Sequence, residues 1–276
     1  MMDRRTFSHA VVTSLAALRA NHSGAATKLG PIGIQLYTVR DLFAKKPEAT
    51  LNRLAQAGYR EVEFAGYNKL PVKAIRGMLE RNGLTAPSAH IDLTDIRTRW
   101  PAVLDFAKEV GHRYLVLAYL DRADRYALDS YRKVADLLNQ AATAAKKVGI
   151  EVAYHNHDFE FIPIDGQTPY DVFLAACDRS LVKVEMDLYW MAKGGGDPLA
   201  YFAKYPGRFP MVHVKDMSQG AGQEMVDLGT GRIDFKGIFA KSAQAGITHY
   251  FVENDEPKDP MAFARSAATY LKRLEY

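Results

Sequence analysis

Cysteine is almost absent from this chain of 276 residues, which contains Cys177 alone. A single cysteine cannot form a disulfide within the chain, so the fold cannot depend on oxidation. Cys177 follows an apolar run at residues 172–176, and we interpret it as a small buried side chain rather than a nucleophile. Segments rich in proline, glycine or serine are also missing, so the sequence gives no linker that would divide the chain into two domains.

Excess charge of either sign is small. The formal net charge is +4, and +3 of it lies in residues 1–28, where the basic residues outnumber Asp3. Those basic residues are Arg4, Arg5, Arg19 and Lys28. The rest of the chain therefore carries +1, which does not provide the basic surface that nucleic-acid binding requires. We expect no nucleic-acid partner.

Long hydrophobic runs are lacking as well. The apolar segment at residues 10–18 is too short to cross a bilayer as a helix, so we expect no stable membrane anchor. Arg4 and Arg5 precede this segment and resemble a twin-arginine export signal. We interpret residues 1–28 as an export signal or disordered N-terminus, which predicts a periplasmic or otherwise exported protein. A cytoplasmic protein is the alternative.

From residue 31 onward, short β-rich runs alternate with segments of helical periodicity. The eight expected strands are 32–37, 61–64, 86–91, 114–118, 151–155, 182–187, 211–214 and 250–253. The expected helices are 48–57, 72–81, 101–110, 130–148, 169–177, 198–205, 235–245 and 261–274. Strict alternation favours a parallel sheet, and eight units favour an α/β fold closed into a (β/α)8 TIM barrel over residues 31–276. An open doubly wound sheet would normally show a Gly-x-Gly-x-x-Gly turn after its first strand, and none is present.

Polar side chains stand at the carboxyl ends of the last four expected strands, where barrel enzymes place their active sites. These ends read His155-Asn156-His157, Glu185-Met186-Asp187, His213-Val214-Lys215 and Glu253-Asn254-Asp255. Because side chains alternate along a strand, His155 and His157 share one face of their strand. Neighbouring strand ends meet at one mouth of a barrel, so this mixture of carboxylates and imidazoles predicts a divalent cation site.

These motifs resemble the sugar phosphate isomerase/epimerase members of the xylose isomerase-like TIM barrel superfamily. The resemblance covers the chain from about residue 32 onward, with motifs at 34–40, 154–161, 187–190, 213–217, 229–235 and 252–257. In that family a Glu, an Asp, a His and a Glu on strands five to eight hold the cation, and Asp187, His213 and Glu253 match the last three. His155 stands where the strand-five glutamate is expected. Either His155 binds the cation or three protein ligands and water do so, and Glu160 is a more remote substitute.

The resemblance implies a sugar isomerase or epimerase that moves a proton next to a carbonyl through a cation-stabilised enediolate. The expected catalytic residues are Glu253, His157 and His155, with His155 facing the cation and His157 meeting the substrate. Because imidazole and carboxylate donors suit a borderline cation, we expect Mn²⁺, with Zn²⁺, Co²⁺ or Mg²⁺ as alternatives. The candidates for substrate binding are Gln35, Tyr37, Glu63, His90, Trp190 and Lys215.

Three other functions stay open at this point. A lyase or hydrolase of 3-keto-glycosides would use the same cation and the same proton abstraction, and an export signal favours it. An endonuclease similar to the abasic-site enzymes of the superfamily would need a richer set of metal ligands. A non-catalytic sugar-binding barrel would have no need to keep Asp187, His213 and Glu253. In the leading interpretation the partner is a small-molecule carbohydrate, and the sequence leaves a homo-oligomer open.

Overall fold

The computed structural model describes residues 27–276, and within them eight parallel strands close into a barrel. In order around the barrel the strands are β1 (Gly33–Gln35), β2 (Glu61–Phe64), β3 (Thr85–Ile91), β4 (Tyr114–Leu117), β5 (Glu151–His155), β6 (Val182–Asp187), β7 (Met211–Val214) and β10 (His249–Val252). The expected (β/α)8 TIM barrel is confirmed. Of the expected export segment at residues 1–28, residues 1–26 lie outside the described residues.

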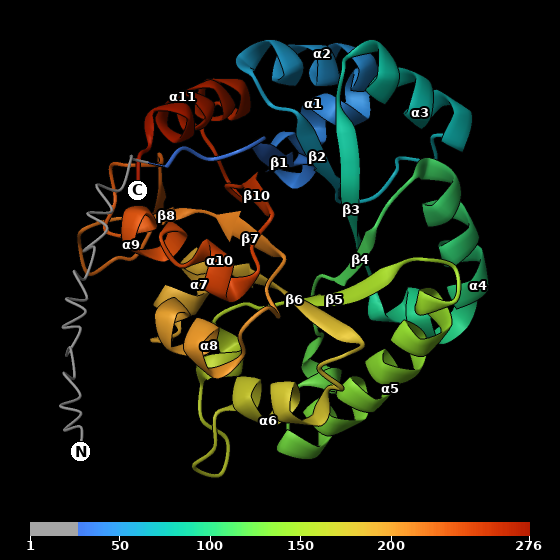
Figure 1. Cartoon of the computed structure of the whole chain (residues 1–276), viewed down its shortest axis with the longest axis vertical. Helices are drawn as coiled ribbons and strands as arrows, with labels where there is room; N and C mark the ends of the chain where they lie inside the picture. The colour runs from blue at the N-terminus through green and yellow to red at the C-terminus, as the bar shows by residue number, and fades with distance from the viewer. Residues whose placement is uncertain (1–26) are drawn as a thin grey trace, which may run out of the picture.

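Helices surround the strands, as Figure 1 shows. They are α1 (Arg40–Lys45), α2 (Pro47–Ala57), α3 (Val72–Arg81), α4 (Leu93–Val110), α5 (Leu128–Lys146), α6 (Pro169–Ala176), α7 (Leu188–Lys193), α8 (Pro198–Lys204), α9 (Phe235–Phe239), α10 (Ser242–Ala245) and α11 (Pro260–Arg273). A small antiparallel hairpin of β8 (Asp216–Met217) and β9 (Met225–Val226) follows β7. Within residues 27–276, no helix combines the length and apolar character that a membrane span requires.

Two elements near the site differ from the expected ones. The first strand ends at Gln35, whose side chain accepts a hydrogen bond from the Tyr37 N–H and starts a 3₁₀ turn at Leu36–Val39. Helix α4 begins at Leu93, well before residue 101, and is kinked at Arg99. Pro101 explains this kink, because a proline ring conflicts with the carbonyl group four residues earlier in a helix.

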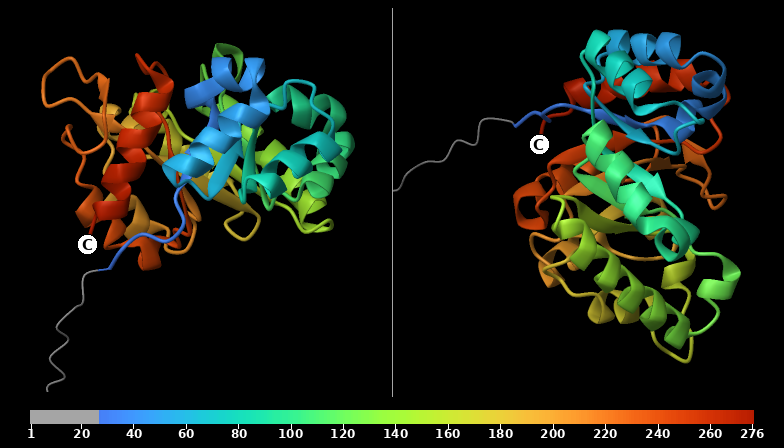
Figure 2. Two further views of the ribbon diagram at one scale, coloured as in Figure 1. Left: turned by 90° about the horizontal axis from the view of Figure 1, so that it is seen from above. Right: turned by 90° about the vertical axis from the view of Figure 1, so that its right-hand side faces the viewer.

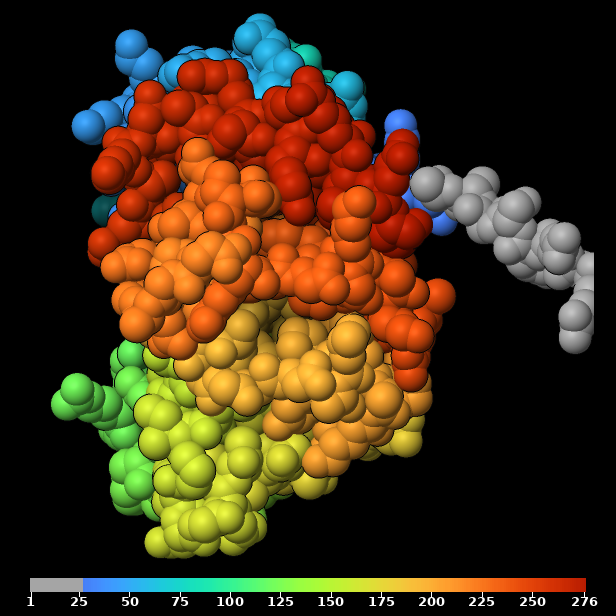
Figure 3. All heavy atoms as spheres, turned by 90° about the vertical axis from the view of Figure 1, so that its left-hand side faces the viewer, coloured from blue at the N-terminus to red at the C-terminus, as the bar shows by residue number. Residues whose placement is uncertain are grey.

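The barrel closes where β1 meets β10, with Gly33 paired to Phe251. A Cβ atom at residue 33 would collide with the Phe251 ring, so this seam requires glycine. In the space-filling view of Figure 3, the segments follow one another around the barrel as bands of colour in chain order. Lys28 and Glu275 form an isolated antiparallel bridge, and the first described residues lie beside the C-terminus in both views of Figure 2.

The inside of the barrel changes from apolar to polar along its axis. A small buried cluster of apolar side chains forms the floor, namely Tyr114, Val116, Ala153, Met211 and Phe251. Nearer the carboxyl ends of the strands, buried polar residues replace it, among them Gln35, Glu63, His155, Glu185, Asp187, His213 and Glu253. Burying so many polar groups is costly unless they bind one another or a ligand. This polar layer is therefore the candidate site.

Candidate metal centre

Asp187, Glu253 and Lys215 meet at the carboxyl ends of β6, β10 and β7, and we call them the Asp187 group. The Nζ atom of Lys215 lies 3.0 Å from Asp187 Oδ2 and 2.7 Å from Glu253 Oε2. It also lies 2.8 Å from Asp255 Oδ1. The Nδ1 atom of His213 lies 2.6 Å from Glu253 Oε2 and 3.9 Å from Asp187 Oδ2.

The position of Asp187 is fixed by local hydrogen bonds. Its Oδ1 atom accepts a hydrogen bond of 2.8 Å from the Trp190 N–H and thereby caps α7. The Asn156 side chain accepts from the Asp187 N–H at 3.1 Å and donates to its carbonyl oxygen at 3.3 Å. The Oδ2 atom is buried and makes no hydrogen bond within the described residues, although Lys215 lies close to it. The cap and the asparagine therefore hold one carboxylate oxygen available for a cation.

Glu185, Glu63 and His90 lie on the other side of His213, and we call them the Glu185 group. Glu185 stands two residues before Asp187 on β6, one inward-facing position deeper in the barrel. Its Oε2 atom lies 2.8 Å from His90 Nε2 and 3.1 Å from His213 Nε2. Glu63 Oε2 lies 2.7 Å from His213 Nε2 and accepts a hydrogen bond of 2.8 Å from Gln35. The Ser88 hydroxyl donates to the other oxygen of Glu63.

His155 and His213 connect the two groups. The Nδ1 atom of His155 lies 3.2 Å from Glu185 Oε2, and its Nε2 atom lies 3.7 Å from Asp187 Oδ2. His213 likewise presents Nε2 to the Glu185 group and Nδ1 to the Asp187 group. Both rings are buried. The strand-five histidine thus lies between Glu185 and Asp187.

The protonation of these histidines follows from their surroundings. Burial opposes the charge on His213, but the carboxylates of Glu185 and Glu253 outweigh it and raise its pKa well above the usual range. Burial also opposes the charge on His90, and Glu63 and Glu185 raise its pKa to about 10. Burial, together with the neighbouring His213, keeps the pKa of His155 well below the usual range. His155 is therefore neutral, which is the form of imidazole that binds metals.

The donors and charges of both groups fit a divalent cation. Ligand atoms of Asp187, His213 and Glu253 lie within 4.8 Å of one another, and so do those of His90, His155, Glu185 and His213. The two groups contain four carboxyl groups, and Asp255 adds a fifth. The ion-pair partners of these five within residues 27–276 are Lys215 and histidines. Because Lys215 is the one permanent cation in this set, protons or a metal ion must balance the remaining negative charge.

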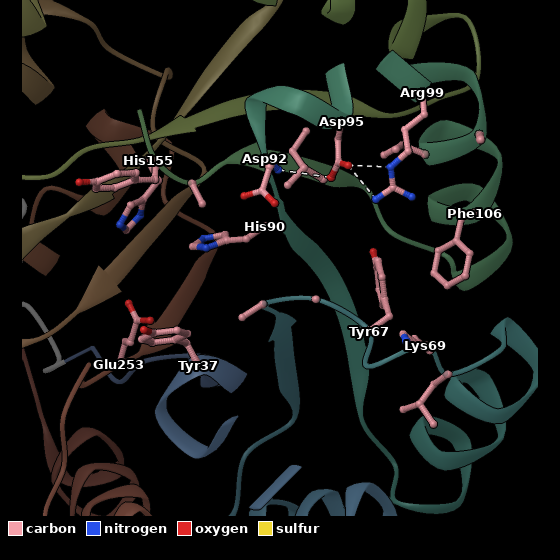
Figure 4. Close-up of a pocket in the computed structure, with 18 of the residues that line it drawn as sticks. Tyr37, Tyr67, Lys69, His90, Asp92, Asp95, Arg99, Phe106, His155 and Glu253 are labelled. Carbon is pink, nitrogen blue, oxygen red and sulfur yellow. Dashed lines mark hydrogen bonds and ion pairs between the residues drawn. The ribbon is translucent and has the colours of Figure 1, made fainter. Parts of the chain in front are cut away.

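A cleft with a volume of about 1040 Å³ opens over these groups. His90, His155, Lys215 and Glu253 line one end of it. In Figure 4, Glu253, His90 and His155 surround a common space, with Tyr37 beside Glu253. Glu63, Glu185, Asp187 and His213 are buried beneath that surface. A ligand in the cleft would therefore meet the histidines, Lys215 and Glu253 first.

His157 also lines this end of the cleft. Among the histidines of residues 27–276, it is the one whose ring makes no hydrogen bond. Its ring centroid lies 5.1 Å from that of Tyr119 and 5.4 Å from those of Phe159 and Trp190. Burial, aided by Lys215, lowers the pKa of His157 to about 3. The imidazole is therefore neutral, and its Nδ1 atom has no hydrogen-bond partner within the described residues.

Among the residues considered from the sequence, Gln35, Glu63, Trp190 and Glu160 do not line the cleft. Trp190 packs behind His157, and its ring centroid lies 5.7 Å from Lys215 Nζ. Glu160 accepts hydrogen bonds from the Tyr154 hydroxyl and, at 3.0 Å, from the His157 N–H. Burial raises the pKa of Glu160 to about 7. Glu160 thus orders the turn after β5 and is not among the grouped donors.

The polar strand ends read from the sequence include Glu185 and Asp255, although neither was assigned a role, and nothing in the sequence indicated Ser88. Glu185 could have been assigned to the site, because it lies two positions before Asp187 and therefore on the same face of the strand. The opposite face of that strand is apolar. Asp255 follows Glu253 by two residues in the same way. The part of the cleft formed by residues 65–71 and α4 carried no recognisable motif, so nothing in the sequence indicated it.

Comparison with known proteins gives a family match. The model of the xylose isomerase-like TIM barrel family matches residues 51–274. An inosose dehydratase of Lacticaseibacillus casei is 23% identical over 269 residues, which cover 81% of this chain and 88% of that protein. A sugar phosphate isomerase/epimerase structure from Parabacteroides distasonis is 28% identical, with a TM-score of 0.77 over 91% of this chain and 95% of that one. A structure of the IolI protein with a bound zinc atom has 14% identity and a TM-score of 0.69, covering 87% and 96%.

Proposed function

Because this chain belongs to the xylose isomerase-like TIM barrel family, we propose that it is a cation-dependent sugar isomerase or epimerase. The observation that carries the proposal is the convergence of Asp187, His213 Nδ1 and Glu253 beneath a cleft. The same cleft presents His157, whose ring nitrogens have no partner within the described residues. The named relatives, an inosose dehydratase and a sugar phosphate isomerase/epimerase, support a sugar as the substrate.

His155, Asp187, His213 and Glu253 would hold the divalent cation. Mn²⁺ is the ion we expect, with Zn²⁺, Co²⁺ or Mg²⁺ as alternatives, because the donors mix imidazole with carboxylate. When bound, such an ion polarises a carbonyl oxygen and offsets the negative charge of an enediolate. Glu63 accepts at the far nitrogen of His213, which orients the ring so that Nδ1 faces the cation, as second partners of metal-bound histidines usually do.

The proton is moved by side chains that face the cleft. His157 accepts the proton as the C–H bond next to the carbonyl breaks and the electron pair moves toward the carbonyl oxygen. Return of a proton to the same carbon from its other face gives an epimer, and return to the neighbouring carbon gives an isomer. Glu253 is the second proton carrier. Burial opposes its ionisation, but Lys215 and His213 hold its pKa below the usual range, so the side chain is a carboxylate that can accept a proton. Lys215 and Asp255 are placed to orient hydroxyl groups of the sugar.

Elimination is the second candidate, and the match to inosose dehydratases favours it. The same proton is removed, and the electron pair then expels a hydroxyl or alkoxyl group from the adjacent carbon, which leaves as water or an alcohol. A 3-keto-glycoside would lose its aglycone in this way. The export that we propose from residues 1–28 agrees with such a substrate, since sugar phosphates are scarce outside the cytoplasm.

Proton exchange in D₂O tests both reactions. The full chain loaded with Mn²⁺ is incubated with a panel of keto-sugars and 3-keto-glycosides, and deuterium at the carbon next to the carbonyl is followed by NMR. We expect exchange with at least one member of the panel, and the product then separates isomerisation from elimination. His157→Asn should slow the exchange roughly a hundredfold or more, as is typical of a lost acid–base group, without loss of the metal.

His249→Asn is the matched control, because His249 starts β10 at the opposite end of the barrel, where it pairs with Glu61. This variant should exchange at the rate of the unmodified protein. Absence of exchange with every compound at full metal occupancy would contradict the proposed function. Unchanged exchange in the His157 variant would remove that residue from the mechanism.

A further inference from the structure

The cleft continues well beyond the groups that would hold the cation. From His155 and Glu253 it extends to Leu70, Val103 and Phe106, as Figure 4 shows in part. Its volume of about 1040 Å³ lies just above the roughly 300–1,000 Å³ range of clefts that hold drug-sized ligands. A single sugar ring bound beside Glu253 would therefore leave the other end of the cleft empty.

This distal end is a shaped wall rather than a loose surface. Tyr67 is fixed by a hydrogen bond of 3.0 Å between its hydroxyl group and His112 Nε2, and its ring centroid lies 4.5 Å from that of Phe106. Asn68 and Lys69 have φ angles of 47° and 60°, a conformation that few residues other than glycine adopt. They bring Leu70 back toward the cleft. The kink of α4 before Pro101 directs the second part of that helix, with Val103 and Phe106, toward the same space.

The wall is apolar and only half buried. Tyr67, Leu70, Val103 and Phe106 each have intermediate exposure in the chain, and all four line the distal end. A concentration of half-exposed apolar side chains in a concave site is typical of ligand binding. Rings with an apolar face, whether sugar or aromatic, stack well against tyrosine and phenylalanine.

The charges around the distal end are balanced. Lys69 and Arg99 are matched by Asp92 and Asp95, and all four line the cleft. Arg99 and Asp95 are paired at 2.7 Å. A phosphate group would call for an excess of positive charge or a bidentate arginine free to bind it. The balance therefore favours an uncharged group at this end.

We infer that the distal end is a subsite for a second, uncharged ring attached to the sugar that reacts beside Glu253. The substrate class is accordingly a keto-sugar glycoside, with either a sugar or an aromatic group as the aglycone. This inference rests on the proposed function for the identity of the reacting end. The wall itself is defined by Tyr67, Leu70, Val103 and Phe106.

Direct binding measurements test the subsite without turnover. The full chain loaded with Mn²⁺ is titrated in a calorimeter with methyl β-D-glucopyranoside, 4-nitrophenyl β-D-glucopyranoside and cellobiose. We expect the two longer probes to bind at least about tenfold more tightly than the methyl glucoside, and the stronger of the two identifies the aglycone as aromatic or sugar. Val103→Trp, which fills the distal end, should abolish this preference, since a single methylene group in an apolar pocket already changes binding about 10- to 200-fold.

Asp105→Trp is the matched control, because Asp105 is an exposed residue of the same helix that does not line the cleft. It should keep the preference for the longer probes. If Val103→Trp fails to fold, as judged by its melting curve, Phe106→Ala replaces it and should reduce the preference instead. No preference in the unmodified protein, or equal loss of it in both tryptophan variants, would overturn the subsite. A preserved preference without deuterium exchange would contradict the proposed reaction and leave the subsite standing.

Discussion

The Asp187 group and the Glu185 group contain similar residues around the same histidine but are built differently. In the Asp187 group, Lys215 lies within 3.0 Å of both Asp187 and Glu253, and Glu253 faces the cleft. In the Glu185 group, the carboxylates lie beneath the cleft and are held by histidines, Gln35 and Ser88. Glu253 and Lys215 of the first group can reach a substrate, whereas the carboxylates of the second group mainly fix the ring of His213. Similar residues two positions apart on one strand thus take different roles according to depth.

The largest effect should come from exchanging carboxylate for amide on β6. Asp187→Asn removes a charged ligand atom facing the cation position, and we expect both bound metal and activity to fall below detection. Glu185→Gln changes the same chemistry one inward-facing position deeper, and we expect a 10- to 100-fold loss of metal affinity, as for other partners of metal-bound histidines. Metal analysis and calorimetric titration with Mn²⁺ measure both. If Glu185→Gln lost the metal and Asp187→Asn kept it, the cation would belong to the Glu185 group.

A smaller change is expected at His155, which touches both groups. His155→Glu restores the carboxylate that the family resemblance predicts on strand five and adds a negative charge to the cation position. We expect Mn²⁺ affinity to rise at least about tenfold, equivalent to about 1.4 kcal/mol, relative to His155→Gln. The glutamine variant is the control for the loss of imidazole without a gain of charge. Equal affinities in the two variants would show that residue 155 does not contact the cation.

An effect of another kind, on stability and not on metal binding, is expected at His112, which belongs to neither group and supports the distal wall through Tyr67. Burial lowers the pKa of His112 to about 4, below the value of about 6.5 for an unfolded chain. The unfolded state therefore binds the proton first, so stability is complete above pH 6.5 and falls as the pH drops toward 4. We expect a loss of up to about 3 kcal/mol in the free energy of unfolding over that range. Urea unfolding at pH 7 and pH 4.5 measures it.

His112→Asn provides the comparison for that measurement. It removes the titrating ring, so the drop in stability between the two pH values should shrink by roughly the contribution of His112. A drop that is as large in the variant as in the unmodified chain would assign the acid sensitivity to other groups. The free energy of unfolding is the quantity measured in both proteins, and activity is not used in this comparison.

Much of the fold could be predicted from local patterns. The range of α3 was predicted as it occurs, at Val72–Arg81, and those of α2 and α11 were displaced by one residue at most at each end. Gly58 and Gly111 end α2 and α4 with φ angles of 106° and 101°, as glycines after a helix commonly do. The early start of α4 was missed because proline is common at the first position of a helix, so Pro101 was interpreted as the start of the helix and not as the cause of a kink within it.

Asp187, His213 and Glu253 could be placed together from the sequence because each ends a strand, and parallel strands in a closed barrel bring their carboxyl ends to one mouth. Alternation along a strand settled which neighbours share a face. These two rules need no knowledge of the tertiary structure. They determined the end of the barrel that carries the candidate site and the polar side chains that the last four strands bring there, while the alternation of strands and helices determined the barrel itself.

Only the tertiary structure decided which side chains touch. Glu63 lies 150 residues from His213 in the chain, yet its carboxylate is 2.7 Å from the ring, because closure of the barrel lets side chains of β2 and β7 meet in its interior. The distal wall likewise depends on Tyr67 and Phe106, which come from a loop and a kinked helix. A sequence specifies the face and the end at which a residue lies. The contact between two such residues depends on the register and packing of the whole barrel, which no local pattern contains.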